Sequence, residues 1–183
     1  MVSGLSGSIS FGVRTLAAFI AVAVLAGCSS KSDKAEAAAF CPKAYIVGDA
    51  SQLTRFKPGP GRDPTDVAFR ADVLQAENVC EFSRDGATID TKVTLGVQEG
   101  PSAQNRQASF NYFVALIGPG NRIVAREEFT ADFKFEGNRT RLAGVEELRQ
   151  RAGLTTETAA GYQVAIGIAL SPEELDYNRR LQR

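Results

Sequence analysis

The 183-residue sequence contains no histidine and no tryptophan, and it has only three cysteines and one methionine. Without histidine, neither a Ser-His-Asp triad nor a Cys-His pair can form, and imidazole cannot act as a metal ligand. A zinc site needs about four ligands, which three cysteines without histidine do not favour. The composition therefore predicts that the chain is not an enzyme, has no catalytic residues and holds no metal or cofactor.

Carboxylates are the acid–base groups that remain, and adjacent pairs occur at Glu127-Glu128, Glu146-Glu147 and Glu173-Glu174. Neighbouring side chains of a strand point to opposite faces, so Glu127 and Glu128 cannot act together. The other pairs lie in segments with helical patterns, where they would be solvated or capping. Glu127 falls on the otherwise apolar face of its strand, where it is a buried partner of an arginine, a residue at the strand end or a site carboxylate, and the first two are favoured. A carboxylate hydrolase that uses Glu127 is the weakest of three functional hypotheses.

Charge of one sign is also lacking, since 21 Lys and Arg residues balance 21 Asp and Glu residues. The chain contains no long basic run. Nucleic acids and anionic lipids bind clustered basic side chains. The sequence therefore predicts no nucleic-acid partner.

The first 27 residues have the order of a secretory signal peptide. Arg14 is their one charged residue, the apolar run Thr15–Leu25 follows it, and the small residues Ala26 and Gly27 end the segment. The run is shorter than the ~20 apolar residues that a membrane-spanning helix needs. We therefore expect residues 1–27 to be cleaved off as a signal peptide.

The segment Leu25-Ala26-Gly27-Cys28 resembles the lipobox of bacterial lipoproteins. This resemblance implies diacylglycerol on the Cys28 sulfur, cleavage before Cys28 and an N-linked acyl chain, with palmitate as the expected fatty acid. Two or more acyl chains hold a protein on a membrane where one chain does not. Ser29 follows the cysteine, and in the enterobacterial sorting scheme a residue other than Asp there favours the outer membrane. The alternative is an ordinary secreted protein in which Cys28 lies near the cleavage site by chance.

Residues 28–39 form the expected acylated cysteine and flexible tether. They are small or polar and contain no large apolar side chain, so they cannot contribute to a core. Eleven residues at up to ~3.6 Å each reach about 40 Å when extended. Residues 40–183 are expected to form a single periplasmic β-rich domain that the tether joins to the membrane.

Cys41 and Cys80 remain once Cys28 is acylated. The periplasm is oxidising, so this even pair is most simply a structural disulfide. On the chain-entropy model, such a bond across about 40 residues contributes roughly 4 kcal/mol. A metal or redox pair is the alternative, although neither cysteine belongs to a C-x-x-C motif.

Period-two alternation of apolar and polar residues dominates the rest of the chain, which predicts half-buried strands. The segment Phe110–Ile117 is apolar on both faces and predicts a central or covered strand. Ile123–Phe135 is long enough to bend or to split in two. The expected strands are 44–47, 53–56, 67–74, 78–83, 89–98, 110–117, 123–135 and 164–170.

Turn residues separate these strands. Gly118-Pro119-Gly120-Asn121 predicts a hairpin in which Gly120 takes a positive φ, and Gly86, Gly100-Pro101 and Gly137-Asn138 mark further breaks. Lys57–Pro64 contains three prolines, which predicts a loop.

Two helices are expected. Val145–Ala152 has apolar residues at helical spacing and ends at Gly153. Ser171-Pro172-Glu173-Glu174 is a capping box with proline at the first helical position, and it predicts a short C-terminal helix.

Seven or eight strands joined by hairpin turns predict a mainly β protein, an antiparallel β-sandwich of the immunoglobulin or fibronectin-III kind with that C-terminal helix. A small β-barrel or a curled sheet with a helix is the alternative. Several segments resemble envelope lipoproteins of alphaproteobacteria, a likeness that carries no functional motif and implies location only. These segments are Phe40-Cys41-Pro42, Gly100-Pro101, Tyr112–Ile117, Leu170–Leu175 and Asn178-Arg179.

Three functions are compatible with these sequence features. The first is a membrane-anchored, non-enzymatic structural or interaction module of the cell envelope. It would bind an envelope protein through its edge strands and through loops such as Lys57–Pro64 and Ser102–Gln107. The second is a periplasmic domain that binds a small apolar or glycan ligand, and the third is a carboxylate hydrolase that uses Glu127. A filled core with an exposed apolar edge would favour the first function, and a roomy apolar cavity would favour the second.

Overall fold

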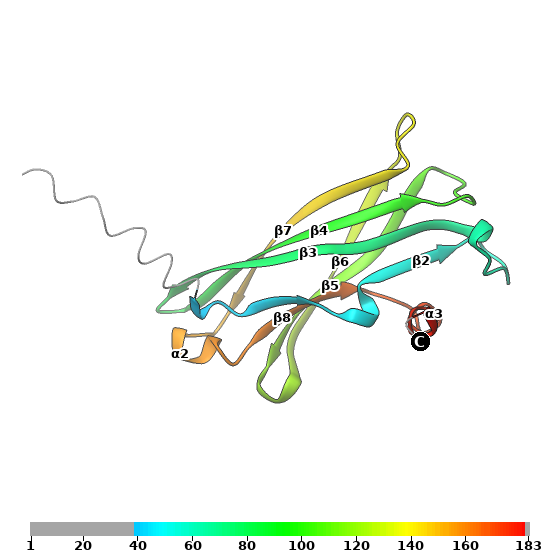
Figure 1. Ribbon diagram of the computed structural model, residues 1–183. Helices are drawn as coiled ribbons and strands as arrows, with labels where there is room; N and C mark the ends of the chain where they lie inside the picture. The colour runs from blue at the N-terminus through cyan, green and yellow to red at the C-terminus, as the bar shows by residue number, and fades with distance from the viewer. Residues whose placement is uncertain (1–38, 182–183) are drawn as a thin grey trace, which may run out of the picture. The chain divides into compact units, whose positions relative to one another are not determined.

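Eight strands form two four-stranded sheets in the computed structural model, which describes residues 39–181 (Figure 1). The first sheet has the order β1-β8-β5-β6, and the second has the order β2-β3-β4-β7. The sheets do not close into a barrel, so the predicted β-sandwich is confirmed. The strands are β1 (Lys43–Ile46), β2 (Gln52–Phe56), β3 (Val67–Ser83), β4 (Gly86–Glu99), β5 (Gln107–Gly118), β6 (Arg122–Lys134), β7 (Arg141–Ala152) and β8 (Gln163–Ile168).

Short helical segments connect or follow the strands. The α-helices are α2 (Thr156–Ala159) and α3 (Pro172–Leu181), and the 3-10 turns are η1 (Gly48–Ala50), η2 (Pro64–Asp66) and η3 (Pro119–Asn121). No helix within residues 39–181 is long and apolar enough to cross a membrane.

Antiparallel pairing joins every neighbouring pair of strands except β1 and β8, which are parallel. Strands β3 and β4 form a long hairpin that runs along the whole length of the second sheet (Figure 1). A register irregularity between Val73 and Gln75 lets β3 continue through both of the strands predicted at 67–74 and 78–83.

Apolar side chains from both sheets fill the space between them. The second sheet contributes residues such as Leu53, Ala71 and Leu95, and the first contributes Val114 and Ile166, each at most 1 % exposed. This alternation of inward apolar and outward polar residues is the pattern that predicted the strands. The interior is therefore a packed core that holds the sheets together.

Each end of the sandwich gathers a different set of connections. At one end, which we call the entry end, the chain enters at Ala39, and β3 turns into β4 while β5 turns into β6. The opposite end, which we call the loop end, carries the connections 57–66, 100–106 and 135–140 and the helix α3 (Figure 1). Hydrogen bonds join these loops, because Ser102 Oγ donates to the Thr65 carbonyl and Arg106 donates to the Gly137 carbonyl.

The predicted hairpin after β5 is confirmed, since Gly120 has a φ of 72° between two strands paired in register. The segment 123–135 does not split, because β6 is one strand from Arg122 to Lys134. The prediction that it is half-buried along its whole length is wrong, because residues 122–128 are exposed on both faces and burial begins at Phe129. Lys57–Pro64 is a loop, as its prolines predict.

The helix predicted at Val145–Ala152 is wrong, because this segment belongs to strand β7. Its Glu, Leu, Arg, Gln and Ala residues all have high helix propensity. The side chains nevertheless alternate between exposed and half-buried along the whole of β7, and every residue pairs with β4. Cross-strand pairing and burial of Leu142 and Leu148 outweigh the local preference.

The predicted C-terminal helix is confirmed as α3. Ser171 Oγ accepts the Glu174 backbone N–H, and the Glu174 carboxylate accepts the Ser171 N–H, which completes the capping box. The buried side chain of Asn178 donates to the carbonyls of Asp49 and Gln52 at 2.9 and 2.8 Å. These two bonds fix α3 to η1 and to the start of β2.

Candidate functional site

Cys28, the predicted lipidation site, and residues 28–38 of the predicted tether lie outside the described residues. Cys41 and Cys80 form the predicted disulfide, with their Cα atoms 5.4 Å apart. Asn78 supports the same corner, because its Nδ2 donates to the Pro42 carbonyl at 3.0 Å. The chain is thus bonded to β3 two residues before β1 begins.

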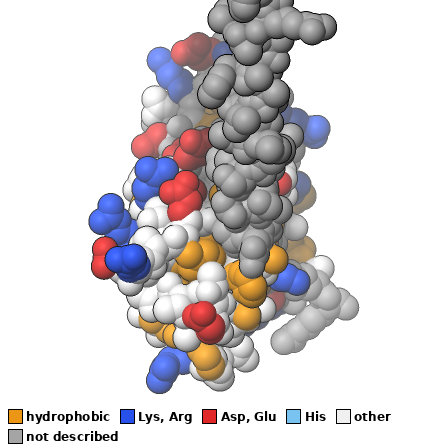
Figure 2. Space-filling model, turned by 90° about the vertical axis from the view of Figure 1, so that its left-hand side faces the viewer, with side chains coloured by type: hydrophobic (Ala, Val, Ile, Leu, Met, Phe, Trp, Pro, Cys, Tyr) orange, Lys and Arg blue, Asp and Glu red, His pale blue; other side chains and the backbone are white. Residues whose placement is uncertain are grey.

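Figure 2 looks onto the entry end, where hydrophobic side chains lie between basic and acidic ones. Val79 on β3 is 64 % exposed, and Phe40 beside the disulfide is 37 % exposed. Where Figure 2 leaves this face visible, basic and acidic side chains are intermixed.

Glu127, the candidate for carboxylate hydrolysis, is exposed on β6 opposite Val114. Its neighbour Glu128 lies in an ion pair with Arg126, with Arg126 Nη1 2.7 Å from Glu128 Oε1. Arg126 also stacks over the Phe113 ring. Within residues 39–181, no group of three or more Cys, Asp or Glu side chains is arranged to hold a metal ion.

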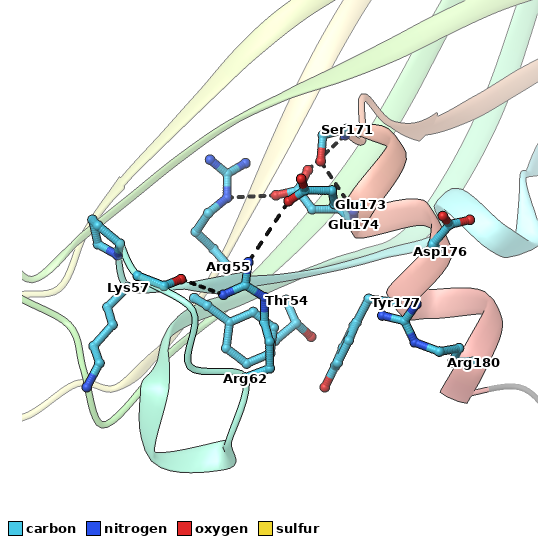
Figure 3. Close-up of a pocket in the computed structure, with 13 residues that line it drawn as sticks. Thr54, Arg55, Lys57, Arg62, Ser171, Glu173, Glu174, Asp176, Tyr177 and Arg180 are labelled. Carbon is cyan, nitrogen blue, oxygen red and sulfur yellow. Dashed lines mark hydrogen bonds and ion pairs between the residues drawn. The ribbon is translucent and has the colours of Figure 1, made fainter.

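A cleft of about 560 Å³ opens at the loop end, and we call it the loop-end cleft (Figure 3). The end of β2 forms its floor, the loop after β2 forms one wall, and the first two turns of α3 form the other. In Figure 3 the Arg62 guanidinium points toward Glu173 on α3 and toward the Gly59 carbonyl of its own loop. The lining residues are Thr54–Gly59, Arg62, Ser171, Glu173, Glu174, Asp176, Tyr177 and Arg180.

The loop wall is held in one shape by Asp66. Its carboxylate accepts Lys57 Nζ at 2.7 Å and the Asp63 backbone N–H at 3.2 Å. Lys57 and the Asp63 N–H hold the pKa of Asp66 below its usual value. A Cβ at Gly61 would meet the same carboxylate, so any larger residue there must displace it. Contacts within the loop therefore fix its shape without a bound ligand.

Two aromatic rings and one guanidinium form the centre of the cleft. The rings of Phe56 and Tyr177 pack edge to face with centroids 5.2 Å apart. The Arg62 guanidinium lies 5.3 Å from the centroid of Phe56, and it donates to the Gly59 and Gly61 carbonyls. Arg62 is thus oriented by its own loop and remains about half exposed.

The helix wall is tied to the floor by Glu174, whose Oε1 lies 2.9 Å from Arg55 Nε. The same carboxylate caps α3, so one side chain positions both the helix and Arg55. Glu173 points outward with 88 % of its side chain exposed, and it reaches Arg62 only at 4.0 Å. Arg180 completes the rim further along the helix.

Four basic and three acidic side chains line the loop-end cleft, so both signs of charge surround two aromatic rings. Such a surface has no strong attraction for a polyanion. Arginine and tyrosine beside apolar rings are the residues enriched where proteins bind proteins. The arrangement supports recognition of a ligand with both charged and apolar groups.

No protein-family model, curated protein or solved structure matches this chain. The predicted likeness to envelope lipoproteins of alphaproteobacteria therefore stays a prediction.

The sequence predicts one wall of this cleft and misses the other. Lys57–Pro64 is a predicted contact loop, and it lines the cleft. The second predicted loop, Ser102–Gln107, lies at the same end and braces the first through Ser102. Tyr177 and Arg180 are not among the predicted contact residues, although their spacing from Glu173 places all three on one face of a helix.

Proposed function

We propose that this protein is a bacterial lipoprotein, anchored through acylated Cys28 at the periplasmic face of the outer membrane, and that it acts as a non-enzymatic interaction module. Its partner would be another protein of the cell envelope, bound in the loop-end cleft. The signal-peptide pattern, the lipobox and the oxidised Cys41–Cys80 pair are the features that support this location.

The observation that carries the proposal is the position of the cleft relative to the point where the chain enters the domain. The disulfide at Cys80 lies at the entry end of β3, and the cleft lies beside the residues that precede β3 at its other end. A strand of 17 residues spans roughly 55 Å. A domain tethered at its entry end would present this cleft away from the lipid surface.

The chemistry of the cleft favours a protein as the partner. Arg62, Tyr177 and Phe56 supply rigid contact area with charged or polar tips, and Asp66 and Glu174 hold their supports in place. Preformed contacts reduce the entropy lost on binding. The apolar-ligand hypothesis receives less support, because buried side chains fill the space between the sheets and charged groups line the cleft.

The anchor is tested by mass spectrometry of the protein purified from membranes. We expect the mature N-terminus to be Cys28 with diacylglycerol and an additional acyl chain. The Cys28→Ala variant should lose these chains and leave the membrane fraction. An unacylated wild-type N-terminus would refute the anchor without touching the cleft.

The cleft is tested by photo-crosslinking in intact cells, with a benzophenone amino acid at Arg180. We expect one discrete protein adduct, which disappears when Tyr177 and Arg62 are both changed to alanine. The same probe at Val79, exposed at the entry end, is the matched control and should not give that adduct. An adduct that survives the double substitution, or a glycan in place of a protein, would contradict the proposed partner class.

A further inference from the structure

The outer edge of β7 is a long strand edge that the fold leaves open. β7 pairs with β4 over all twelve residues without a register shift, and no strand within residues 39–181 pairs with its other side. Neither proline nor a bulge interrupts it. The other long edge strand, β6, has a register irregularity where it pairs with β5. Long regular edges accept a further strand unless bulges, prolines, short length or charged side chains protect them. The charges of β7 therefore decide which strand can add to it.

A second copy of β7 could add to this edge in antiparallel direction. A two-fold axis perpendicular to the sheet keeps each face on its own side, so residues that face each other must share a face. The axis then passes midway between the two copies of one residue of β7, and we name each axis by that residue. Exposed residues of β7 would meet exposed residues, and half-buried residues would meet half-buried ones.

Charge excludes most positions of this axis. An axis through Glu146, Glu147 or Arg149 places each of these residues against itself. An axis through Val145 places Arg141 against Arg149, and one through Gln150 places Arg149 against Arg151. Like charges directly opposite each other destabilise strand pairing. Every one of these positions is therefore unfavourable.

An axis through Leu148 has the opposite character. Glu147 then faces Arg149 of the second copy, and Glu146 faces Gln150 of the second copy, each pair occurring twice by symmetry. Leu148 meets its own counterpart, and Val145 meets Arg151. No like charges are opposed, so the sequence of β7 is complementary to itself in this register. An axis through Gly144 also opposes no like charges and places Arg141 against Glu147, but it pairs seven residues of β7, whereas the axis through Leu148 pairs nine.

The charges of β4 extend the pattern. Within one chain, Lys92 is paired in register with Glu147, and Asp90 with Arg149. Arg149 binds both oxygens of Asp90, with Nε 2.7 Å from Oδ1 and Nη2 3.0 Å from Oδ2. Across the axis the row would read Lys92, Glu147, then Arg149 and Asp90 of the second copy, alternating in sign throughout.

We propose that the outer edge of β7 is a homodimer interface in which two copies pair about Leu148 and join their second sheets into one of eight strands. This inference does not depend on the proposed function, since it uses only β4 and β7. The partner is a second copy of this chain because the complementarity is between the strand and itself.

In the proposed dimer, the entry ends of the two copies lie close together. Cys80 is in register with Ile89 of β4, which is in register with Gln150, two residues from the axis. With ~3.3 Å per residue and ~4.8 Å between strands, the two Cys80 residues would lie roughly 28 Å apart. The entry ends of both copies would therefore lie near the middle of the dimer, and the two loop ends would point outward.

The charge pairing is tested with two full-length copies that carry different C-terminal tags, are expressed together and are solubilised in mild detergent. We expect one wild-type copy to capture the other. Glu147→Arg alone and Arg149→Glu alone should each reduce self-capture at least about tenfold, because each homodimer would oppose like charges twice. Glu147→Arg expressed with Arg149→Glu should restore capture. In the mixed dimer, each residue at position 147 faces a residue of opposite charge at position 149 of the other copy.

Glu128→Arg on β6 is the matched control, since it also reverses an exposed glutamate on an edge strand. It should leave capture unchanged, and loss of capture there would place the interface on β6 and overturn the proposal. Failure of wild-type copies to capture each other, or of the two variants to restore capture, would also overturn it.

Circular dichroism of each purified variant shows whether it folds. A second test avoids charge changes altogether, with a benzophenone amino acid at Val145. Peptide mapping should place its adduct at or beside Arg151 of a second copy. An adduct to a different protein, or none, would count against the β7 dimer even if the charge variants were unstable.

Discussion

At the scale of single residues, Asp66 decides the shape of the loop-end cleft. It is buried, and it holds Lys57 and the Asp63 N–H at one point. Gly61 lies against this carboxylate so closely that a methyl group could not be added without moving it. The loop wall therefore depends on a glycine for space rather than for backbone freedom.

We expect Gly61→Ala to lower the free energy of unfolding by about 1–2 kcal/mol, because the Asp66 carboxylate must leave its partners. Chemical denaturation followed by circular dichroism measures the change. Gly48→Ala is the control, since a Cβ there meets nothing within 4 Å, and it should change stability by less than about 0.5 kcal/mol. Equal effects of the two substitutions would show that Asp66 does not hold the loop.

Tyr112 is a second residue whose surroundings are measurable. Burial in the core, aided by the negative charge of Glu146, raises the pKa of Tyr112 from 10.0 to about 12. The native state thus keeps a proton between pH 10 and 12 that the unfolded chain has lost. Stability is complete below pH 10 and falls as the pH rises through this window, by up to ~1.4 kcal/mol per pH unit.

We expect denaturation midpoints of the wild type to decrease between pH 10 and 12, and the Tyr112→Phe variant to lose this part of the dependence. The chain has four tyrosines and no tryptophan, so absorbance near 295 nm follows tyrosinate without interference. One tyrosine should titrate together with unfolding in the wild type. An identical pH profile in Tyr112→Phe would disprove the assignment.

At the scale of elements, α3 depends on one buried amide. Asn178 donates to the carbonyl of Asp49 in the connection between β1 and β2 and to the carbonyl of Gln52 in β2. The side chain is only 6 % exposed, so water cannot replace these bonds unless the structure rearranges. We expect Asn178→Ala to cost about 1–3 kcal/mol. Hydrogen exchange should show α3 losing protection before the strands.

Arg179→Ala is the comparison for that substitution. It removes an exposed ion pair, between Arg179 Nε and Asp49 Oδ2 at 2.9 Å, on the same helix and toward the same connection. Exposed ion pairs contribute ~0–1 kcal/mol, so this variant should keep α3 protected. If both variants released α3 equally, the helix would be held by its charges rather than by Asn178.

Two similar segments show what the sequence could and could not predict about elements. Both 145–152 and 172–181 are rich in Glu, Leu and Arg, yet the first is a strand and the second a helix. The second has a local start signal in Ser171, Pro172 and Glu174, and that signal predicted it correctly. The first has no such signal, and its conformation depends on pairing with β4, which lies over forty residues away in the chain. Local propensity cannot report a partner at that distance.

At the scale of the whole molecule, the sequence predicted the sandwich and the disulfide but not what lies at each end. Strand periodicity identifies faces, and cysteine counting identifies a pair. Which loops meet depends on the strand orders β1-β8-β5-β6 and β2-β3-β4-β7, which no local pattern contains. Tyr177 and Arg62 are 115 positions apart, and only this order brings them to one cleft.

The disulfide has a whole-molecule role that follows from the shortness of β1. A four-residue strand paired on one side only is weakly held, and Cys41 precedes it by two residues. We expect the double variant Cys41→Ser/Cys80→Ser to lose roughly 4 kcal/mol, since the bond closes a loop with a sequence separation of 39.

The loss should also be uneven. Amides of β1 should exchange with solvent well before those of β5 and β8, because the core between the sheets remains intact. A pull on the chain before Cys41 would then detach β1 first, whereas in the oxidised protein the force passes through Cys80 into the long β3–β4 hairpin. Hydrogen exchange of the two forms under identical conditions measures this difference. Uniform exchange across β1, β5 and β8 in the variant would show that the disulfide stabilises the fold only globally and does not secure the point where the chain enters it.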